Sequence, residues 1–555
     1  MSNDLLQKLM AAQTDEERSW IVTENLLESL PEDEANALLA VAIPHWFDAE
    51  ILAALCPELA DRAEKIYQNL QNLSCVEAFP DRGHNVHELT RNQLLDRLWK
   101  DNPERFRELS GRASAYFAQD DKPENQIEWI YHLVIADSDI GISEFQSLAQ
   151  RWDSTFHITE LSSLIINLKQ QFSTNKLVID INFIKAIINF WEGRINFIFN
   201  RIQDALDNYE KAEQFFYKTI VSLEYQLQSI KQEISNYKQI ISKITGINIG
   251  KSKIYSLSLI ILIIKFAIIW RHLCGYVKAQ KISVWLLLQL ILFIISKFLI
   301  FTDNIYILGV RSSILESRVI SATLYTANSL KALGDISKHL EKNAKALKRY
   351  ESAITLYRKI DNQLGEANTL KAIGDVLQFC KQIKKALKKY EIALAIYREI
   401  GDFIGEANTL KAIGDVLQSL DLRTEALERY EVALAIYREI GDRLGEANTL
   451  QTIALLEEDP VIGLASSQSA LNMYIEIGDK YSQARNLSYF TSKIQLKLGQ
   501  KAEAISALTL ASKLAQEVNY QPMVDYVNQK IAEINSDSQG ITGWFYWIKS
   551  KFWKE

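Results

Sequence analysis

The sequence predicts a mainly α-helical protein: a solenoid of helical hairpins, preceded by a small α+β domain and interrupted by a hydrophobic helical hairpin. Three observations support this fold class. The stretch GEANTLKAIGD runs from Gly365 to Asp375 and recurs letter for letter from Gly405 to Asp415. The 555 residues include only 8 Pro and 21 Gly, which favours long helices over a strand-rich fold. A pair of long apolar segments precedes the repeats.

The composition limits the function classes. A chain of 555 residues is too long for a single hydrophobic core, so we expect several structural units. A net charge of -7 argues against generic nucleic-acid binding. The four cysteines are scattered, with no metal or redox spacing, which predicts free thiols in a reducing compartment. The N-terminal stretch MSNDLLQKLMAAQTDEERSW has no apolar signal core, so we expect no cleaved secretion signal.

Each repeat predicts two helices. The segments Gly365–Ile404 and Gly405–Leu444 align without gaps, and Tyr325–Leu364 aligns in the same frame. Apolar and small residues recur at helical spacing in each copy, first through NTLKAIGDVLQ (helix A) and then through KALKKYEIALAIYREI (helix B). The Ile-Gly-Asp that follows helix B predicts a helix stop, with Gly in the left-handed conformation.

The spacing of the small residues resembles the tetratricopeptide repeat family. Gly374 is followed at fixed intervals by Ala386, Tyr390 and Ala393. The same set recurs as Gly334, Ala346, Tyr350 and Ala353, and as Gly414, Ala426, Tyr430 and Ala433. Small residues are expected where two helices cross at short distance. The resemblance implies a non-catalytic scaffold that mediates protein–protein interaction, with copies longer than the family's usual length of about 34 residues.

The array is predicted to extend over residues 325–534. Pro460 marks a distorted turn, after which Ala470 and the stop at Gly478 keep the frame. A further unit carries Ala504, Leu508 and Ala511, and Gln521–Ile534 predicts a helix that caps the last open apolar face.

A degenerate repeat lies upstream, within a helical region at residues 121–250. Gly193, Ala205, Tyr209 and Ala212 keep the same intervals. We therefore expect that the solenoid begins before the apolar segments and is interrupted by them.

The interruption, residues 251–302, predicts a transmembrane hairpin. Its apolar segments are Ile254–Trp270 and Ile282–Phe301, and the second is long enough to cross a hydrocarbon core. Trp285 and Lys297 are expected to anchor it at the membrane interface. A pair of buried solenoid helices, or a re-entrant or surface-lying pair, remains an alternative. The basic link between the segments conflicts, by the positive-inside rule, with two cytoplasmic flanking parts.

The tail, residues 535–555, predicts a second, peripheral membrane anchor. It ends in GWFYWIKSKFWKE, where Trp544, Trp547 and Trp553 alternate with lysines. Aromatic rings settle at membrane interfaces, and lysines attract anionic lipid headgroups. A helix packed on the last repeat is the alternative. We expect a membrane-associated protein whose soluble domains face the cytoplasm.

Residues 1–120 predict helices followed by a β-hairpin around Gly83, in CVEAFPDRGHNVHEL. This order resembles the winged-helix segment of NB-ARC/STAND signalling ATPases, here without the ATPase domain. Val86-His87-Glu88-Leu89 stands where that family has its Met-His-Asp motif, and we expect a structural or interface role for His87. The resemblance implies an alternative function, as the regulatory partner of a separate signalling ATPase. The expected recognition helix, Glu58–Leu73, is nearly neutral, so we expect no nucleic-acid binding.

Motifs for catalysis or cofactor binding are not expected. GINIGKS, at Gly246–Ser252, has the wrong spacing for a phosphate-binding loop. In HNVHE, His84 and His87 would point to opposite faces of a strand and would not converge on a metal. The sequence therefore predicts that the protein is not an enzyme and uses no cofactor or metal.

The resemblance implies that polar positions of helix A line a partner-binding groove. A protein or peptide ligand is expected there, and lysines beside asparagines favour an acidic one. These side chains are not required for helix packing in this interpretation, and they could instead be solvated residues preserved by recent duplication. The predicted groove residues are Asn328, Lys331, Asn368, Lys371, Asp375, Asn408, Lys411, Asp415 and Asn448. The oligomeric state is left open.

Overall fold

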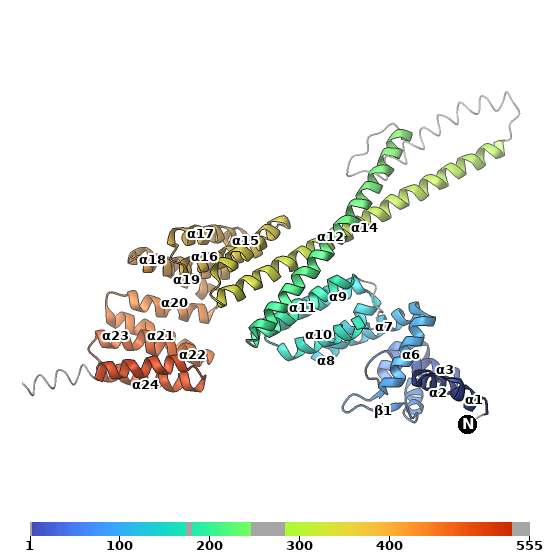
Figure 1. Ribbon diagram of the computed structural model, residues 1–555, viewed down its shortest axis with the longest axis horizontal. Helices are drawn as coiled ribbons and strands as arrows, with labels where there is room; N and C mark the ends of the chain where they lie inside the picture. The colour runs from blue at the N-terminus through green and yellow to red at the C-terminus, as the bar shows by residue number, and fades with distance from the viewer. Residues whose placement is uncertain (1–2, 174–179, 246–283, 536–555) are drawn as a thin grey trace, which may run out of the picture. The chain divides into compact units, whose positions relative to one another are not determined.

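The structure is a computed structural model that describes residues 3–173, 180–245 and 284–535 (Figure 1). The chain divides into two compact units, Met1–Ser329 and Leu330–Glu555. Each unit is described by itself below.

In its described residues, the first unit is built of helices and one small β-hairpin. Its elements are α1 (Asn3–Ala11), α2 (Asp15–Ser29), α3 (Glu32–Val41), α4 (Ala49–Leu55), the 3-10 helix η1 (Pro57–Arg62), α5 (Ala63–Leu70), β1 (Val76–Ala78), β2 (His84–Val86), α6 (Glu88–Asp101), α7 (Pro103–Phe117), α8 (Pro123–Ala136), α9 (Ser138–Ser154), α10 (Ile158–Ser173), α11 (Ile181–Ile198), α12 (Ile202–Thr245) and α14 (Val284–His339), which continues into the second unit.

The described part of the second unit, up to residue 535, consists of helices joined by short turns. They are α15 (Asn343–Lys359), α16 (Gln363–Phe379), α17 (Ile383–Ile400), α18 (Phe403–Ser419), α19 (Arg423–Ile440), α20 (Arg443–Leu456), α21 (Pro460–Ile477), α22 (Lys480–Asn486), the π-helix η2 (Leu487–Thr491), α23 (Ser492–Lys497), α24 (Lys501–Glu517) and a last helix at residues 521–535.

The predicted β-hairpin is confirmed. β1 and β2 pair antiparallel, with Val76 opposite Val86. Gly83 has φ +87°, and a Cβ there would lie 2.5 Å from the Phe47 carbonyl oxygen, so this turn requires glycine. The single helix expected over Glu58–Leu73 is wrong. It is divided into η1 and α5, because Arg62 (φ -120°) leaves the helical region between them.

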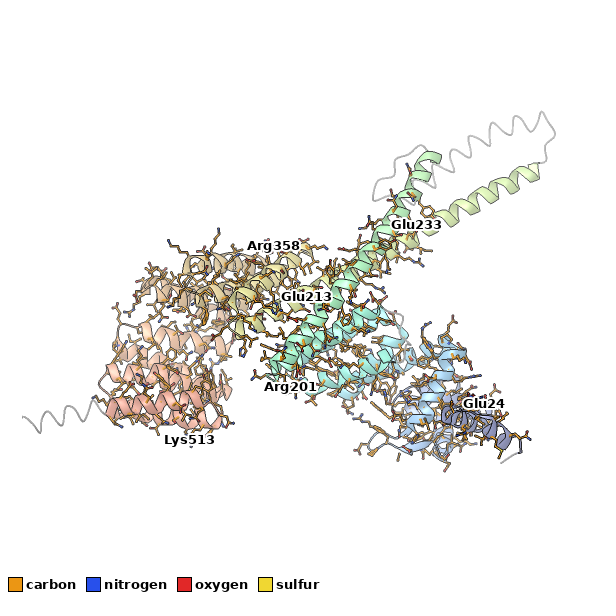
Figure 2. The ribbon with its side chains drawn as sticks, viewed as in Figure 1. Glu24, Arg201, Glu213, Glu233, Arg358 and Lys513 are labelled. Atoms are coloured by element: carbon orange, nitrogen blue, oxygen red, sulfur yellow. The ribbon has the colours of Figure 1, made fainter. Side chains whose placement is uncertain are left out.

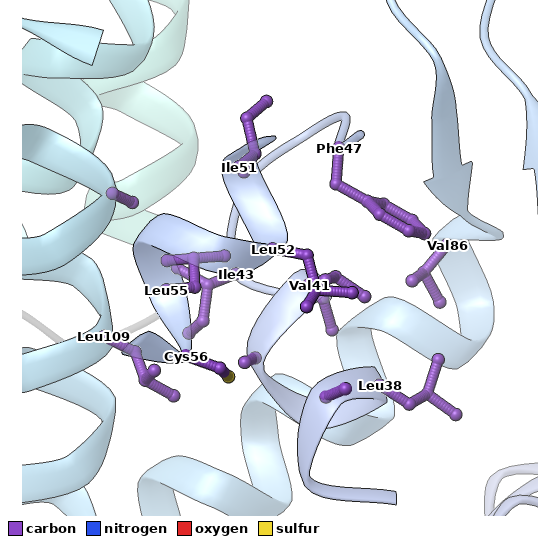
Figure 3. Packing of buried hydrophobic residues seen from close by; sticks show 14 of the residues in the cluster. Leu38, Val41, Ile43, Phe47, Ile51, Leu52, Leu55, Cys56, Val86 and Leu109 are labelled. Carbon is purple, nitrogen blue, oxygen red and sulfur yellow. The ribbon is translucent and has the colours of Figure 1, made fainter. Parts of the chain in front are cut away.

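A compact apolar core holds α3, α4 and the hairpin together. Figure 3 shows Val41, Phe47, Leu52 and Val86 among its side chains. Each is buried, and burying one such side chain contributes about 1.5–3 kcal/mol. The observed order of helices followed by a hairpin matches the expectation. The relation to a winged helix stays a prediction.

A buried polar cluster fixes the loop between α3 and α4. Arg91 donates to the backbone oxygens of Ile43 (2.7 Å) and Pro44 (3.3 Å). His45 Nδ1 lies 2.5 Å from Glu128 Oε1, and His132 Nε2 lies 3.2 Å from Glu128 Oε2. Burial, only partly offset by Glu128, lowers the pKa of His132, so the imidazole is neutral. Burial alone would raise the pKa of Glu128, but His45 and His132 hold it below its usual range.

The residues expected to form a degenerate repeat lie on two packed helices, α11 and α12. Ala205, Tyr209 and Ala212 are buried, and a Cβ on Gly193 would lie 3.0 Å from the Tyr209 ring. Tyr325 of α14 joins the same core, with its ring 5.3 Å from that of Phe190. The segment between α12 and α14 therefore connects two helices that share one core.

Beyond that core, α12 and α14 extend further. Lys231 and Glu316 link them through an ion pair (2.7 Å), and Figure 2 labels Glu233 on this part of α12. Ile254–Trp270, the tail and GINIGKS lie outside the described residues. Trp285 and Lys297 fall on α14, but their side chains are also outside the description. Where the chain is described, no helix has the combined length and apolarity to cross a membrane.

The predicted repeats are confirmed as α16–α17 and α18–α19, each helix A followed by a helix B. Gly401 (φ +72°) and Gly441 (φ +74°) end the B helices in the left-handed conformation, as expected. Ala386, Tyr390 and Ala393 are buried, and so are their counterparts in α15 and α19. A helix lies where the capping helix is expected, and its Met523 and Val527 pack in one core with α24.

Each tyrosine ring occupies the space that a glycine leaves on helix A. A Cβ on Gly414 would lie 2.6 Å from Tyr430 Cε1, and one on Gly334 would lie 2.5 Å from Tyr350 Cε1. The first glycine of each copy leaves space for a tyrosine ring of the preceding repeat. Gly405 would collide with Tyr397 if it carried a Cβ. Both glycines of GEANTLKAIGD are therefore spaces for buried rings.

We expect Gly414→Ala to lower the free energy of unfolding by about 1–3 kcal/mol, because overpacking displaces a fully buried ring. Thermal and urea unfolding measure the change. Gly309→Ala is the matched control, since a Cβ there meets no atom within 4 Å, and it should be neutral or stabilising. Equal effects of the two substitutions would contradict this account.

Acidification should destabilise the first unit. The folded-state pKa of His132 is lowered, so its contribution to stability is complete above the unfolded pKa of about 6.5 and is lost as the pH falls. The pKa of Glu128 is also lowered in the folded state, so protonation of this carboxylate removes further stability below about pH 4.3. Thermal unfolding between pH 7.5 and 5 should show a decline that is smaller in His132→Phe. The exposed His157→Gln should leave the slope unchanged.

Candidate ligand groove

The A helices lie on the inner side of the repeat array. α16 contacts α18, whereas α17 and α19 lie less close to each other. Predicted groove residues of α18 and α20 line one pocket, and α16 contacts α18. That these residues bind a ligand stays a prediction. Asn368 and Asn408 are exposed, and Asn448, Lys371 and Lys411 are half-buried.

The groove asparagines are held by buried tyrosines of helix B. Tyr397 donates its hydroxyl proton to Asn368 Oδ1, and Tyr437 donates to Asn408 Oδ1, both at 2.8 Å. In the next repeat Tyr474 donates to Asn448 Oδ1, also at 2.8 Å. Burial raises the pKa of Tyr474 to about 12, so its hydroxyl stays protonated and able to donate.

The groove aspartates are held in a similar way. Tyr390 donates to Asp375 Oδ1 (2.8 Å), and Tyr430 donates to Asp415 Oδ1 (2.7 Å). Lys371 and Lys411 pair with the same aspartates one helical turn away, at 3.2 and 3.1 Å. Lys338 also reaches Asp375. Each aspartate thus satisfies a buried hydroxyl and a nearby lysine.

These contacts correct two parts of the sequence interpretation. Asn368 and Asp375 are not independent of packing, because each accepts a hydrogen bond from a buried tyrosine. The asparagine carboxamide is also directional: its oxygen already accepts, and its Nδ2 is the group with donor capacity. The groove therefore favours a ligand rich in acceptors, such as backbone carbonyls and carboxylates.

A pocket of about 390 Å³ lies at the end of this row. It combines three predicted groove residues with others that the sequence interpretation missed. The residues lining it are Asn408, Lys411, Tyr437, Gly445, Asn448, Gln451, Thr452, Arg485 and Phe490. These described lining residues include two cations and no acid, so the pocket favours an anionic group.

Two buried polar atoms in this pocket lack a hydrogen-bond partner: Arg485 Nε and Gln451 Oε1. Arg485 Nη2 donates to Asn448 Oδ1 (2.6 Å), which fixes the guanidinium against the pocket wall. An unpaired buried donor costs about 1–3 kcal/mol, and a bound carboxylate would remove that cost. Arg485 and Gln451 are thus the strongest additions to the predicted site.

The repeat register could have revealed both residues. Gln451 occupies the position of Lys371 and Lys411 in the next copy. Tyrosine and asparagine are 29 residues apart in the pair Tyr437–Asn408 but 26 apart in Tyr474–Asn448, so the turn near Pro460 is three residues shorter. With that correction, Arg485 falls on the groove asparagine position of the following repeat.

The remaining candidate residues lie on α14 and in the first unit. Lys331 pairs with Asp335 (3.0 Å), as its counterparts do, and Asn328 is half-buried on α14. His87 caps α6, with Nδ1 accepting from the Leu89 amide (3.4 Å), and His84 Nδ1 lies 2.8 Å from the Tyr67 hydroxyl. Within the described ranges, no three metal-ligating side chains gather.

Two substitutions at one asparagine should separate structure from recognition. Asn408→Ala leaves the Tyr437 hydroxyl without an acceptor, so we expect a loss of about 1–3 kcal/mol in the free energy of unfolding. Asn408→Asp keeps an acceptor oxygen for Tyr437, and its stability should lie closer to that of the native chain. Urea unfolding measures both, and equal losses would contradict the tyrosine–asparagine contact.

Comparison with known proteins agrees with the repeat geometry. The sequence model described as tetratricopeptide repeat matches residues 325–399. No curated protein sequence matches the chain.

Solved structures similar to this one are distant in sequence. A signal transduction ATPase with numerous domains and a tetratricopeptide repeat sensor, from Pyrococcus horikoshii, is 13% identical, with a TM-score of 0.38, over 96% of this chain and 69% of its own. Aspartyl phosphate phosphatase F from Bacillus subtilis is 11% identical, with a TM-score of 0.39, over 86% and 94%. The apo quorum sensor NprR from B. thuringiensis is 16% identical, with a TM-score of 0.33, over 84% and 96%. These likenesses assign no function to the chain.

Proposed function

Residues 325–399 are tetratricopeptide repeats, and from this premise we propose that the protein is a non-catalytic scaffold that holds a protein or peptide partner in its repeat groove. Stacked helical repeats create extended inner surfaces suited to such ligands. The observation that best supports the proposal is the pocket with the unpaired Arg485 Nε. It is continuous with the row of asparagines that tyrosines hold in place.

The ligand chemistry follows from the groups that line the pocket, where Lys411 also pairs with Asp415 (3.1 Å) and Arg485 keeps its Nε unpaired. Lys411 and Arg485 supply positive charge, and the carboxamides of Asn408 and Asn448 supply N–H donors. Gln451 Oε1 adds one acceptor, suited to a backbone N–H. An extended peptide with an acidic side chain or a terminal carboxylate matches this set.

Membrane association is the second part of the proposal. It rests on the apolar sequence of Ile254–Trp270 and Ile282–Phe301 and on the aromatic and basic tail. In this proposal the soluble domains face the cytoplasm, and the groove presents its partner close to the bilayer. The alternative role, as regulatory partner of a separate signalling ATPase, stays a prediction from the N-terminal resemblance.

The test is affinity capture from detergent-solubilised membranes, combined with anisotropy titrations of fluorescent acidic peptides. The double substitution Asn408→Asp with Arg485→Gln should abolish capture and weaken peptide binding at least tenfold, because it replaces an N–H donor with a carboxylate and removes a cation. Circular dichroism confirms that the variant is folded.

The matched control is Asn472→Asp on the exposed face of α21. Asn472 also accepts through Oδ1, from Gln468 (3.1 Å), so the substitution again keeps the acceptor and adds a charge. Capture should be unchanged in this control. Unaltered capture by the groove variant, or equal loss in both variants, would overturn the groove proposal.

A further inference from the structure

The outer helices α15 and α17 begin with a dense group of cations. In α17 and the turn before it, these are Lys381, Lys384, Lys385, Lys388 and Lys389, with no acidic residue from position 381 to 390. In α15 and its turn they are Lys342, Lys345 and Lys348, against the single Glu341. Arg349, next in the chain, instead donates to the Leu333 backbone oxygen (3.0 Å) and is not counted in the group. Lys381, Lys384, Lys385 and Lys388 are exposed. We call this group the lysine edge.

Helix stability does not account for the lysine edge. Positive charge at a helix N-terminus opposes the helix dipole, and like charges four residues apart repel. Lys384 and Lys388 are such a pair, and so are Lys385 and Lys389. The first turns of α15 and α17 contain no acidic residue to offset this.

Packing does not account for the lysine edge either. α19 has the same buried residues as α17, with Ala426 and Tyr430 in place of Ala386 and Tyr390. Yet α19 carries Thr424, Glu425 and Glu428 where α17 has lysines. The same helix fold therefore tolerates a mixed or acidic surface. The basic surface is specific to the first two B helices.

Exposed apolar side chains border the lysine edge. The turn between helix A and helix B has one at its start in each repeat: Leu340, Phe379 and Leu420, with 39%, 66% and 45% of the side chain exposed. Glu341, Lys381 and Asp421 share a positive φ of 56–58°, so the three turns have one conformation. Leu340 and Leu420 directly precede this residue, whereas Phe379 lies two residues before it, because Cys380 holds the equivalent position there. Apolar tips next to lysines form an amphipathic rim.

We propose that this rim, from Leu340 to Lys348 and from Phe379 to Lys389, docks on an anionic phospholipid surface. Apolar tips enter the headgroup layer while lysines attract the acidic lipids. The inference extends the membrane part of the proposed function and does not depend on the groove. It gives the repeats their own lipid contact, separate from the apolar segments and the tail.

The chemistry favours lipid over nucleic acid or an acidic protein. Lysine is a point charge without the fork geometry of arginine, so it suits diffuse headgroups better than bidentate recognition. Phe379 is the one aromatic ring among the apolar tips named above, whereas single-stranded nucleic acids are bound by several aromatic rings on which successive bases stack. Apolar tips that stand out from the surface can insert between lipids, whereas a protein partner would need a shaped pocket for them.

The experiment transfers the surface of α19 onto α17. The variant Lys384→Thr/Lys385→Glu/Lys388→Glu is made in the full-length chain. Partition onto vesicles of phosphatidylcholine alone, and with 30 mol% phosphatidylserine, is measured by co-flotation at low and physiological salt. Each lysine near an anionic surface contributes about a fivefold factor. We expect at least a tenfold loss of partition on the phosphatidylserine vesicles and no change on phosphatidylcholine.

Two further variants sharpen the test. The reverse exchange, Thr424→Lys/Glu425→Lys/Glu428→Lys in α19, should raise phosphatidylserine partition. A charge-matched control, Lys493→Thr/Lys497→Glu/Lys501→Glu, changes exposed lysines elsewhere in the second unit and should have little effect. The α17 variant should also melt at a higher temperature in low salt, which separates lost docking from lost folding.

The outcomes distinguish this proposal from the others. Equal losses in the α17 variant and the charge-matched control would show a net-charge effect and overturn the lysine edge. Unchanged phosphatidylserine partition with lost binding of a fluorescent DNA or RNA oligonucleotide would also overturn it, in favour of nucleic acid. If the apolar segments do not anchor the chain, partition onto phosphatidylcholine vesicles is lost. If the groove proposal is wrong, the groove variants leave peptide capture unchanged, and the vesicle results are unaffected.

Discussion

The repeat array depends on one contact: a tyrosine ring of helix B seated where helix A has a glycine. The ring fills the space that a Cβ would occupy, and its hydroxyl reaches a polar side chain of helix A, as Tyr390 reaches Asp375. Glycine sets how closely the helices approach, and the hydrogen bond removes the cost of burying the hydroxyl. The same contact between Tyr209 and Gly193 gives the first unit a related hairpin.

The same tyrosines connect stability to recognition. The hydroxyl groups of Tyr397 and Tyr437 are buried and need a hydrogen-bond acceptor. Asn368 and Asn408 supply it, each at 2.8 Å. With the oxygen of each carboxamide already accepting, its N–H groups are the part with donor capacity for a ligand. The groove is thus preorganised by the packing of the array, which lowers the entropy cost of binding a flexible ligand. Of the described residues that line the pocket at the end of the row, Arg485 and Gln451 keep buried polar atoms unpaired.

Duplication holds the inner side of the repeats nearly constant and leaves the outer side free to change. In the two identical copies of GEANTLKAIGD, both glycines, the asparagine and the aspartate contact tyrosines of helix B. The B helices preserve Ala386, Tyr390 and Ala393 at their buried positions, while the exposed positions between them range from lysine in α17 to glutamate in α19. The A helices can therefore bind a peptide in the groove while the exposed residues of the B helices contact a different partner.

The sequence by itself determined the repeats, their helix boundaries, the left-handed stops at Gly401 and Gly441 and the hairpin around Gly83, because each depends on local spacing and on residues with restricted backbone preferences. It also placed the groove asparagines on one face. Only the tertiary structure decided that Tyr397 orients Asn368, that Asp375 is a packing residue, and that Arg485 and Gln451 share a pocket. Those facts depend on which side chains from separate helices meet at hydrogen-bonding distance, and helical periodicity does not specify that. The expected Glu58–Leu73 helix is another example. Its helical periodicity does not reveal that the backbone leaves the helical conformation at Arg62.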